Sequence, residues 1–342
     1  MRTVYVNNKF VREPDAKISV FDRGFLFGDA VYEVTTVIGG KLLDWEGHVT
    51  RLQKSLKKIH IVMPLDINEL LIIHKELIRR NSLSEGLVYM QISRGVFDRD
   101  FLIDQSQTPT LILFTQEIDL LNANRLNRGL RIMSVPDIRW GRRDIKTVQL
   151  LASSLMKTRA RKNGLDDAWF VQDGYVTEGT SSNAFIVEKG GKVISRDLSN
   201  SILAGITRAK LMKIISNLNL CLEERPFTIK EAQEAEEAFI TSASNFVVSV
   251  IEIDGHIIGD GKIGETTKRT EFVLEYLKRL DQNASRLADN IQGEQSMTKA
   301  IEMAREGKDH IDIVKETGLS NEEVEAIIHS HKEFGKNVGE IL

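Results

Sequence analysis

Four dipeptides with a strong turn preference divide this chain into paired apolar runs, and they constrain its fold more than any other feature. They are Asn7-Asn8, Gly39-Gly40, Asp173-Gly174 and Asp254-Gly255. Asn, Asp and Gly tolerate the positive φ angles that two-residue hairpin turns require. The first two pairs predict hairpins of 4–6 with 10–11 and of 31–38 with 41–43. The last two predict tight turns in the second half of the chain.

Helical patterns alternate with these strands. Apolar residues recur at helical spacing in five segments, which we expect to be helices: 48–59, 67–80, 148–162, 207–218 and 267–280. Further short apolar runs predict strands at 87–93, 110–115, 130–135, 168–171, 175–177, 184–187 and 192–195. The fold class that follows is α/β, with mixed α+β elements.

Two polar stretches suggest how the chain is divided. A length of 342 residues favours about two domains. The Asn-rich stretch 117–128 is expected to connect a small N-terminal α/β domain, 1–116, to a larger C-terminal domain, 129–281. The polar stretch 282–296 then opens an appendage over 282–342. We expect two or three short helices there, with a capping box at 320–323.

Composition narrows the class of protein. Lys and Arg total 46 and Asp and Glu total 49, so the net charge is 46 − 49 = −3. This balance gives no reason to expect nucleic acid or a membrane surface as a partner. No apolar run approaches the ~20 residues that span a bilayer, and the N-terminus lacks a signal-peptide pattern. We expect a cytoplasmic protein without disulfides, in which the single cysteine, Cys221, is a buried structural thiol.

The appendage is acidic. It holds 7 Lys and Arg against 12 Asp and Glu, a net charge of 7 − 12 = −5. Segment 311–328 can be read as a small helix-turn-helix, but this charge has the wrong sign for contact with a phosphate backbone. His329 and His331 lie on different sides of a helix and have no cysteine nearby, so no metal site is expected. An appendage that binds a protein partner or supports a dimer fits this charge better.

Lys146 is the first candidate for chemistry. It stands in the stretch 139–151, RWGRRDIKTVQLL, before an expected helix and among Arg139, Arg142 and Arg143. A lysine acts as a Schiff-base nucleophile when burial or neighbouring cations favour its neutral amine. Lysines are mostly exposed, so this stretch alone favours an ordinary surface lysine.

Glu178 is the second candidate. It lies in the segment 176–183, VTEGTSSN, where an acid follows a short strand and precedes a glycine and three hydroxyl residues. A carboxylate held against a pyridine nitrogen keeps that nitrogen protonated and makes the ring an electron sink. Taken alone, the segment equally suits a polar turn with a solvated glutamate.

Three further segments suggest a phosphate site. Segment 203–208, LAGITR, opens a helix whose free amide groups and Thr207 hydroxyl suit an anion. Segment 239–245, FITSASN, adds small donors after a strand, and Arg51, with His48 one turn before it, supplies a counter-charge. Each of these segments alone more often marks a helix cap or a solvated face.

Together, the segments resemble the fold-type IV pyridoxal-phosphate-dependent enzymes, which include D-amino-acid and branched-chain aminotransferases and aminodeoxychorismate lyases. The resemblance covers about residues 4–280 and is greatest to D-amino-acid aminotransferase. Branched-chain enzymes tend to carry Phe-Glu-Gly-Ile-Arg where this chain has Tyr32-Glu-Val-Thr-Thr. The segments that carry the resemblance are FDRGFLFGDAVYEV at 21–34, GHVTRL at 47–52, DIKTVQLL at 144–151, TEGTSSN at 177–183 and GITR at 205–208.

The resemblance implies a role for each matching residue. Lys146 forms the internal aldimine with pyridoxal 5′-phosphate and shuttles a proton between Cα and the cofactor C4′. Glu178 pairs with the pyridine nitrogen, and Leu203 packs against the ring. Tyr32 and Arg99 hold the substrate carboxylate, the latter across the interface of a homodimer. The phosphate is bound by Arg51, Ile206, Thr207, Ser242 and Ala243, of which Ile206 and Ala243 use backbone amides.

Two departures bear on the activity. This chain reads Arg99-Asp100-Phe101 where the D-enzyme pattern has Arg-x-His, which removes about 1–3 kcal/mol of charged hydrogen bonding. Ala243 stands where a threonine often helps the phosphate. Lys146 and Glu178 do not set the substrate hand, because D- and L-enzymes of this family use the same cofactor face.

The function implied is a ping-pong aminotransferase that moves the amino group of an α-amino acid, such as D-alanine, to a 2-oxo acid such as 2-oxoglutarate. A branched-chain L-amino-acid aminotransferase and an aminodeoxychorismate lyase are the alternatives within the fold. A third hypothesis, of a different class, treats the appendage as a protein-interaction module fused to an enzyme. No metal is expected.

Overall fold

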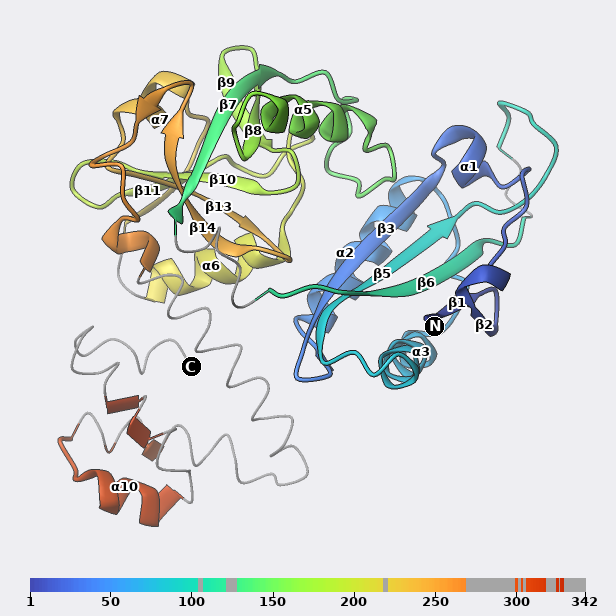
Figure 1. The fold of residues 1–342 in the computed structure, drawn as a ribbon, viewed down its shortest axis with the longest axis horizontal. Helices are drawn as coiled ribbons and strands as arrows, with labels where there is room; N and C mark the ends of the chain where they lie inside the picture. The colour runs from blue at the N-terminus through green and yellow to red at the C-terminus, as the bar shows by residue number, and fades with distance from the viewer. Residues whose placement is uncertain are drawn as a thin grey trace.

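The computed structural model shows two lobes, each built around one β-sheet (Figure 1). It describes residues 1–103, 107–120, 128–217, 221–268, 299–300, 303, 306–317, 324–325 and 327–328. The first sheet takes its strands from residues 3 to 117, and the second takes its strands from residues 130 to 257. Helices and strands alternate in both lobes, which confirms the expected mixed α/β class.

The first sheet is antiparallel throughout. Its order is β2-β1-β6-β5-β3-β4, and every neighbouring pair runs in opposite directions. The expected Asn7-Asn8 and Gly39-Gly40 hairpins are confirmed, and all four turn residues have positive φ. The strands are β1 (Thr3–Val6), β2 (Lys9–Arg12), β3 (Ala30–Ile38), β4 (Lys41–Leu42), β5 (Glu85–Ser93) and β6 (Thr110–Glu117).

Two amphipathic helices cover one face of this sheet, α2 (Trp45–Lys58) and α3 (Ile67–Arg80). Their apolar sides pack against strand residues such as Val31 and Val37 in a single core. Side chains alternate along a strand, so the even-numbered residues of β3 point away from these helices, toward the second lobe. One face of β3 therefore packs in the core with the helices, and the other face is directed toward the second lobe. The short helices η1 (Glu13–Asp15) and α1 (Arg23–Phe27) lie at the rim.

The second sheet is mixed. Its order is β12-β11-β10-β13-β14-β7-β8-β9, with β15 paired to β14. The pairs β7–β8, β7–β14 and β11–β12 are parallel, and the others are antiparallel. The strands are β7 (Leu130–Pro136), β8 (Asp167–Gln172), β9 (Tyr175–Gly179), β10 (Asn183–Val187), β11 (Val193–Ser195), β12 (Leu222–Glu224), β13 (Glu237–Ser242), β14 (Phe246–Ile253) and β15 (His256–Ile257).

Among the described elements, the helices α5 (Leu151–Lys162), α6 (Ile206–Asn217) and α7 (Ile229–Glu234) accompany the second sheet. The expected Asp173-Gly174 and Asp254-Gly255 turns are confirmed, with positive φ at each residue. Helix α5 begins at Leu151, three residues later than expected from residue 148. Most of the expected helix 267–280 and the capping box 320–323 lie outside the described residues.

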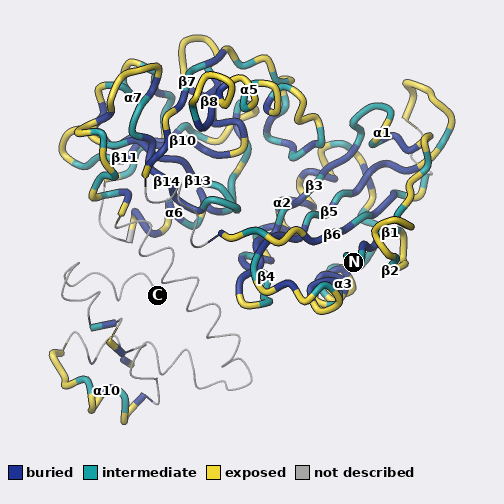
Figure 2. The backbone as a smooth tube through the Cα atoms, in the orientation of Figure 1, coloured by how far each residue is buried: buried dark blue, intermediate teal, exposed yellow. Residues whose placement is uncertain are grey.

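A shared hydrophobic cluster joins the two lobes. It contains Ile38, Leu43 and Leu87 from the first lobe and Phe185, Leu211 and Phe239 from the second. Leu120, within the stretch expected to be a connection, is buried in the same cluster. Figure 2 shows the buried backbone concentrated in both sheets. The two lobes therefore hold each other through apolar packing as well as through the chain between them.

The expectation for Cys221 is wrong, because this residue is exposed. It lies immediately before β12, the edge strand of the second sheet, where no further strand covers it among the described residues. In the appendage, α10 (His310–Thr317) is a helix as expected, and Ala300, Met303, Ile313, Val324 and Ile327 form a small apolar cluster. Within the part of the chain that the structure describes, no helix is both long and apolar enough to cross a bilayer.

Candidate active site

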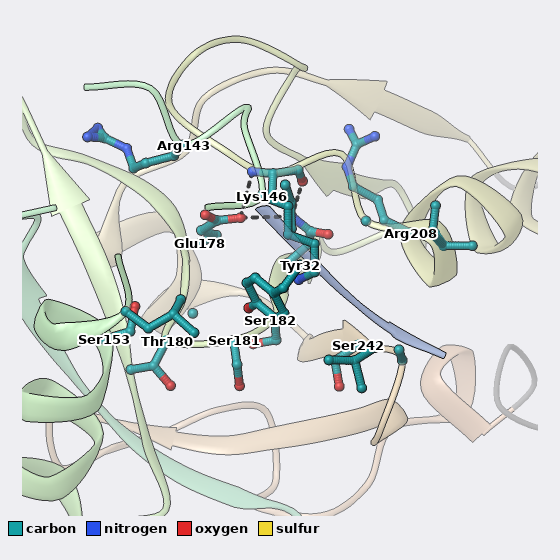
Figure 3. A pocket seen from close by; sticks show the side chains of 18 of the residues that line it. Tyr32, Arg143, Lys146, Ser153, Glu178, Thr180, Ser181, Ser182, Arg208 and Ser242 are labelled. Atoms are coloured by element: carbon teal, nitrogen blue, oxygen red, sulfur yellow. Dashed lines mark hydrogen bonds between the residues drawn. The ribbon is translucent and has the colours of Figure 1, made fainter. Parts of the chain in front are cut away.

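A cavity opens between the two lobes, with β3 on one side and the ends of β9, β10 and β13 on the other. It encloses about 1090 Å³, including its open mouth. Figure 3 shows Lys146, Glu178 and Tyr32 grouped at its centre, with Ser242 at a lower edge. The structure brings together nine of the expected site residues in its lining, namely Tyr32, Arg51, Lys146, Glu178, Leu203, Ile206, Thr207, Ser242 and Ala243.

The first lobe positions Lys146, although this residue belongs to the chain beyond the connection. The backbone N–H of Tyr32 donates to the carbonyl oxygen of Lys146 at 3.0 Å, and Val31 and Thr147 form an isolated bridge. The Lys146 N–H donates to the Ser55 hydroxyl of α2 at 3.3 Å. These bonds dock the segment against β3. They leave the Lys146 amine free to extend over the Tyr32 ring, 4.2 Å from its centroid.

Donors hold the Glu178 carboxylate at both of its oxygens. Oε1 accepts from Arg139 Nη1 at 2.5 Å, whereas Oε2 accepts from the backbone N–H of Leu203 at 3.0 Å and from Asn183 Nδ2 at 3.1 Å. The side chain is buried at the end of β9. Burial raises the pKa of the Glu178 carboxyl, and the Arg139 guanidinium opposes that shift. The carboxylate is therefore fixed in direction before any ligand meets it.

Arg139 is itself held by a buried acid. Asp137 accepts from Arg139 Nε at 2.9 Å and from Arg139 Nη2 at 2.7 Å, and its carboxylate also accepts from the Thr177 hydroxyl at 2.7 Å. The guanidinium lies over the Phe170 ring, 4.3 Å from its centroid. Arg143 lies 3.5 Å from the same aspartate. Two of the arginines near Lys146 in sequence therefore interact with acids: Arg139 binds both Asp137 and Glu178, and Arg143 lies beside Asp137.

Arg51 is locked in place by the helix-facing side of β3. Its Nε and Nη2 donate to the two oxygens of Glu33 at 2.8 and 2.7 Å, and His48 Nδ1 lies 2.7 Å from Glu33 Oε2. Burial alone would raise the pKa of Glu33, but Arg51 and His48 outweigh it and lower the pKa to about 2. Arg51 Nη1 donates to the carbonyl oxygen of Ala204 at 3.0 Å, beside the start of α6.

A second loop faces the cavity after β13. The Thr36 hydroxyl of β3 donates to the carbonyl oxygen of Ala243 at 2.6 Å, and the Asn245 N–H donates to the Ser242 hydroxyl oxygen at 3.0 Å. The Ser242 hydroxyl accepts this bond, so its proton can be donated to a ligand. Together with the first turn of α6, whose leading N–H groups have no partner within the helix, this loop makes one end of the cavity suited to an anion.

Arg99 lies apart from the cavity. It is exposed, stacks over the rings of Phe27 and Phe101, and is not among the described residues that line the cavity of its own chain. Asp100 accepts from the Leu102 N–H at 3.0 Å, and Arg23 donates to the Asp100 carbonyl oxygen at 2.5 Å. The Asp100 carboxylate is thus directed into its own turn.

The family follows from the comparison with known proteins. The model of the amino-transferase class IV family matches residues 30–253, the region that contains the cavity. This chain belongs to that family. A D-alanine aminotransferase of Staphylococcus aureus (strain MSSA476) is 34% identical over 276 residues, which cover 80% of this chain and 97% of the relative.

Solved structures agree with the fold. A branched-chain amino acid aminotransferase from Escherichia coli has a TM-score of 0.73 at 23% identity, over 81% of this chain and 94% of the other. A branched-chain enzyme from Thermoproteus uzoniensis, solved with norvaline, has a TM-score of 0.69 at 24% identity, over 80% and 94%. Another branched-chain enzyme, solved with pyridoxamine 5′-phosphate, has a TM-score of 0.72 at 24% identity, over 80% and 93%. The expected fold-type IV architecture is confirmed, and the protein is a pyridoxal-phosphate-dependent aminotransferase that acts on amino and keto acids.

The residues present fit this cofactor. Ser182 Oγ and Thr241 Oγ1 are buried without a hydrogen-bond partner among the described residues, and both residues line the cavity. Buried polar atoms are normally paired, so these two are suited to a polar ligand. The cavity holds three groups at separate points, and each suits one part of pyridoxal phosphate. The lysine amine suits the aldehyde, the buried carboxylate suits the ring nitrogen, and the anion site suits the phosphate.

Several residues of this site escaped the sequence analysis. Asn183 ends the TEGTSSN segment, and Arg139 was noted only as a cation near Lys146. Glu33 had a detectable signal, because it is the one charged residue in the strand AVYEVTTVI. His48 and Arg51 stand three residues apart on the facing helix, a spacing that puts both side chains on one side.

Proposed function

We propose that this enzyme transfers the amino group of an α-amino acid, with D-alanine among its donors, to a 2-oxo acid such as 2-oxoglutarate. One observation carries the proposal: a lysine amine, a clamped carboxylate and a turn suited to an anion line one cavity. The choice of a D-amino acid rests on the S. aureus relative, which is a D-alanine aminotransferase and is matched over 97% of its length.

Each proposed residue has a distinct task. Lys146 would hold the cofactor through its amine and carry the proton between the substrate Cα and the cofactor. Glu178 would accept a hydrogen bond from the protonated ring nitrogen. Leu203 would pack against the ring. The cofactor, when bound, supplies an electron sink for the negative charge that develops at Cα.

The phosphate would be held by Arg51, by the hydroxyls of Thr207 and Ser242, and by the backbone N–H groups of Ile206 and Ala243. The Glu33 carboxylate already fixes the direction of Arg51, so little side-chain freedom is lost when an anion binds. Tyr32 projects from β3 beside the Lys146 amine, which supports the proposal that it would contact the substrate.

A second copy of the chain completes the proposed site. Arg99 is exposed, and Phe101 and Leu102, which follow it within three residues, are both 77% exposed. We propose that this apolar surface packs in a homodimer and that Arg99 of the partner subunit reaches the substrate carboxylate. The measurements are the mass in solution and the KM of an Arg99→Ala variant. A monomer at working concentration with an unchanged KM would contradict this part.

The lobes and the appendage are proposed to have separate tasks. Residues 1–116 and 129–281 would form the catalytic body, with 117–128 between them, and 282–342 would bind a protein partner. The apolar cluster of Ala300, Met303 and Ile313 is distinct from the clusters of the two lobes. Truncation at residue 282 tests the proposal. It fails if oligomer size and partner capture are unchanged in the shortened chain.

Two experiments test the central proposal. Lys146→Ala should remove the visible absorbance of the loaded protein together with turnover, and persistence of both would refute the role of Lys146. Paired D- and L-amino acids, added without an acceptor, should change the visible spectrum only for true donors. D-alanine should give the change in an aminotransferase but not in a lyase, and an L-branched-chain preference would reverse the assigned hand.

A further inference from the structure

We propose that Asn183 is a positioning residue that ties the Glu178 carboxylate to the turn at the start of α6, and so fixes the separation between the two ends of the cofactor site. The inference rests on the proposed roles of Glu178 and of residues 206–207. It concerns a residue that acts through Glu178 and the turn, and that lies apart in sequence from the expected point of covalent attachment, Lys146. Its basis is a closed set of hydrogen bonds and one close approach.

The hydrogen bonds form a ring of three groups. Asn183 Nδ2 donates to Glu178 Oε2 at 3.1 Å and to the carbonyl oxygen of Leu203 at 2.9 Å. The N–H of Leu203 donates to the same Oε2 at 3.0 Å. A side-chain amide has two N–H hydrogens, and both are used here. The amide nitrogen satisfies both acceptors at this point, whereas an ionised carboxylate has no donor and a hydroxyl has only one.

The close approach involves Gly205. A Cβ atom placed on Gly205 would lie 2.1 Å from Asn183 Oδ1 and 3.3 Å from Cβ of Arg208. The first distance is an overlap, whereas the second is tight but tolerable. The turn before Ile206 therefore lies directly against the asparagine. The amide nitrogen holds Leu203, and the amide oxygen sets how near the turn comes.

The backbone of Asn183 is anchored as well. It is the first residue of β10 and pairs with Thr241 of β13, next to Ser242. Asn183 thus contacts Glu178 and the turn at residues 203–205, and it pairs with β13, the strand that leads into the loop containing Ser242 and Ala243. Because β10 lies inside the sheet, with β11 and β13 on either side, this anchor is rigid.

The first experiment measures the affinity of the full-length apoprotein for pyridoxal 5′-phosphate. Asn183→Ala should raise the dissociation constant about tenfold or more, as expected for the loss of a hydrogen bond to a charged group. Asn183→Asp keeps the size but removes both donors, and it places a second acid beside Glu178. In the loaded Asn183→Asp variant, the pH midpoint of the visible absorbance should therefore rise. In the loaded control variant Ser195→Ala, it should stay near that of the parent.

The matched control is Ser195→Ala. Ser195 lies in β11, next to β10, and its buried hydroxyl donates to the carbonyl oxygen of Ala184 in β10 at 3.0 Å. Ser195 is not among the described residues that line the cavity. Its loss should lower the unfolding midpoint and leave the dissociation constant within twofold of the parent. An equal loss of affinity in this control would overturn the proposal, since the effect would then be general to the sheet.

A size exchange tests the contact from the other side. Gly205→Ala alone should weaken cofactor binding, because its methyl group overlaps Asn183 Oδ1. In Asn183→Ala/Gly205→Ala the methyl group has space, so the double variant should bind no worse than Asn183→Ala alone. Losses that multiply would refute the tie, as would an Asn183→Ala dissociation constant within threefold of the parent. A protein that shows these affinity changes but takes no amino group from D-alanine would refute the substrate assignment alone.

Discussion

Arg51→Met provides the sharpest test of how the first lobe supports the site. Arg51 supplies two of the three side-chain hydrogen bonds to Glu33, whose side chain is 1% exposed. The variant leaves that carboxylate buried with His48 as its remaining hydrogen-bond partner among the described residues. We expect the apoprotein to lose about 3–5 kcal/mol of unfolding free energy at pH 7, the usual cost of removing one partner of a buried ion pair.

The pKa of Glu33 gives a second, separate estimate of this loss in unfolding free energy. The pKa of Glu33 is about 2 in the folded chain, against 4.5 for an ordinary glutamate. At ~1.4 kcal/mol for each pKa unit, the ionised Glu33 contributes on the order of 3 kcal/mol. Because its folded pKa is depressed, this contribution is complete above about pH 4.5 and is lost as the pH falls toward 2. The difference between parent and variant should therefore shrink on acidification.

The assay is urea unfolding of the apoprotein at pH 7 and at pH 4, followed by tryptophan fluorescence. Trp45 reports locally, since it is buried on the same helix as Arg51. Glu33→Gln/Arg51→Met should recover most of the loss, because an uncharged amide replaces the orphaned charge. Lys58→Met is the control on the same helix. Its ion pair with Asp144 is partly exposed, and its loss should cost under about 1 kcal/mol.

Two results would refute the reasoning. The first is a loss below about 1 kcal/mol for Arg51→Met at pH 7, which would make the buried pair no stronger than a surface pair. The second is additivity, in which the double variant is as unstable as the sum of the single variants. Cofactor affinity should fall in both Arg51 variants whatever their stability.

Three further predictions concern other parts of the molecule. Arg139→Met should raise the pKa of Glu178 further, because the guanidinium that opposes the effect of burial is lost, so cofactor binding should improve more steeply with rising pH than in the parent. Arg139→Lys keeps a positive charge and should keep the flatter parental profile; identical profiles for the two variants would refute the role of the charge. Gly86→Ala should cost more than about 1 kcal/mol in urea unfolding, because Gly86 has φ +148° and the new Cβ would lie 2.1 Å from the carbonyl oxygen of Gln116; an unchanged midpoint would contradict the register of β5 and β6. Thr228→Ala should cost about 1 kcal/mol by removing the capping box with Glu231, and a conservative Thr228→Ser should retain it.

Local features of this chain were predictable from its residues. The hairpin at Asn7-Asn8 depends on two residues that accept positive φ, and the helix over 67–80 depends on apolar spacing within its own length. Both were confirmed, the helix with its expected bounds. Such features depend on interactions between residues close in sequence, so the pattern contains the information.

The exposure of Cys221 could not be predicted in this way. Its Leu-rich neighbourhood favoured a buried thiol, but β12 pairs only with β11 among the described strands and forms the edge of the sheet. Which strand is last in a sheet depends on the order of all its strands. No local pattern near Cys221 contains that order.

By itself, the sequence determined the mixed fold class, the turns and the candidate residues Lys146, Glu178 and Arg51. Only the tertiary structure decided what surrounds them: Lys146 docks on Tyr32, Arg139 and Asn183 clamp Glu178, and Glu33 locks Arg51. The physical reason is distance along the chain. Hydrogen bonds are short and directional, and their partners here come from segments that meet only when two sheets pack against each other.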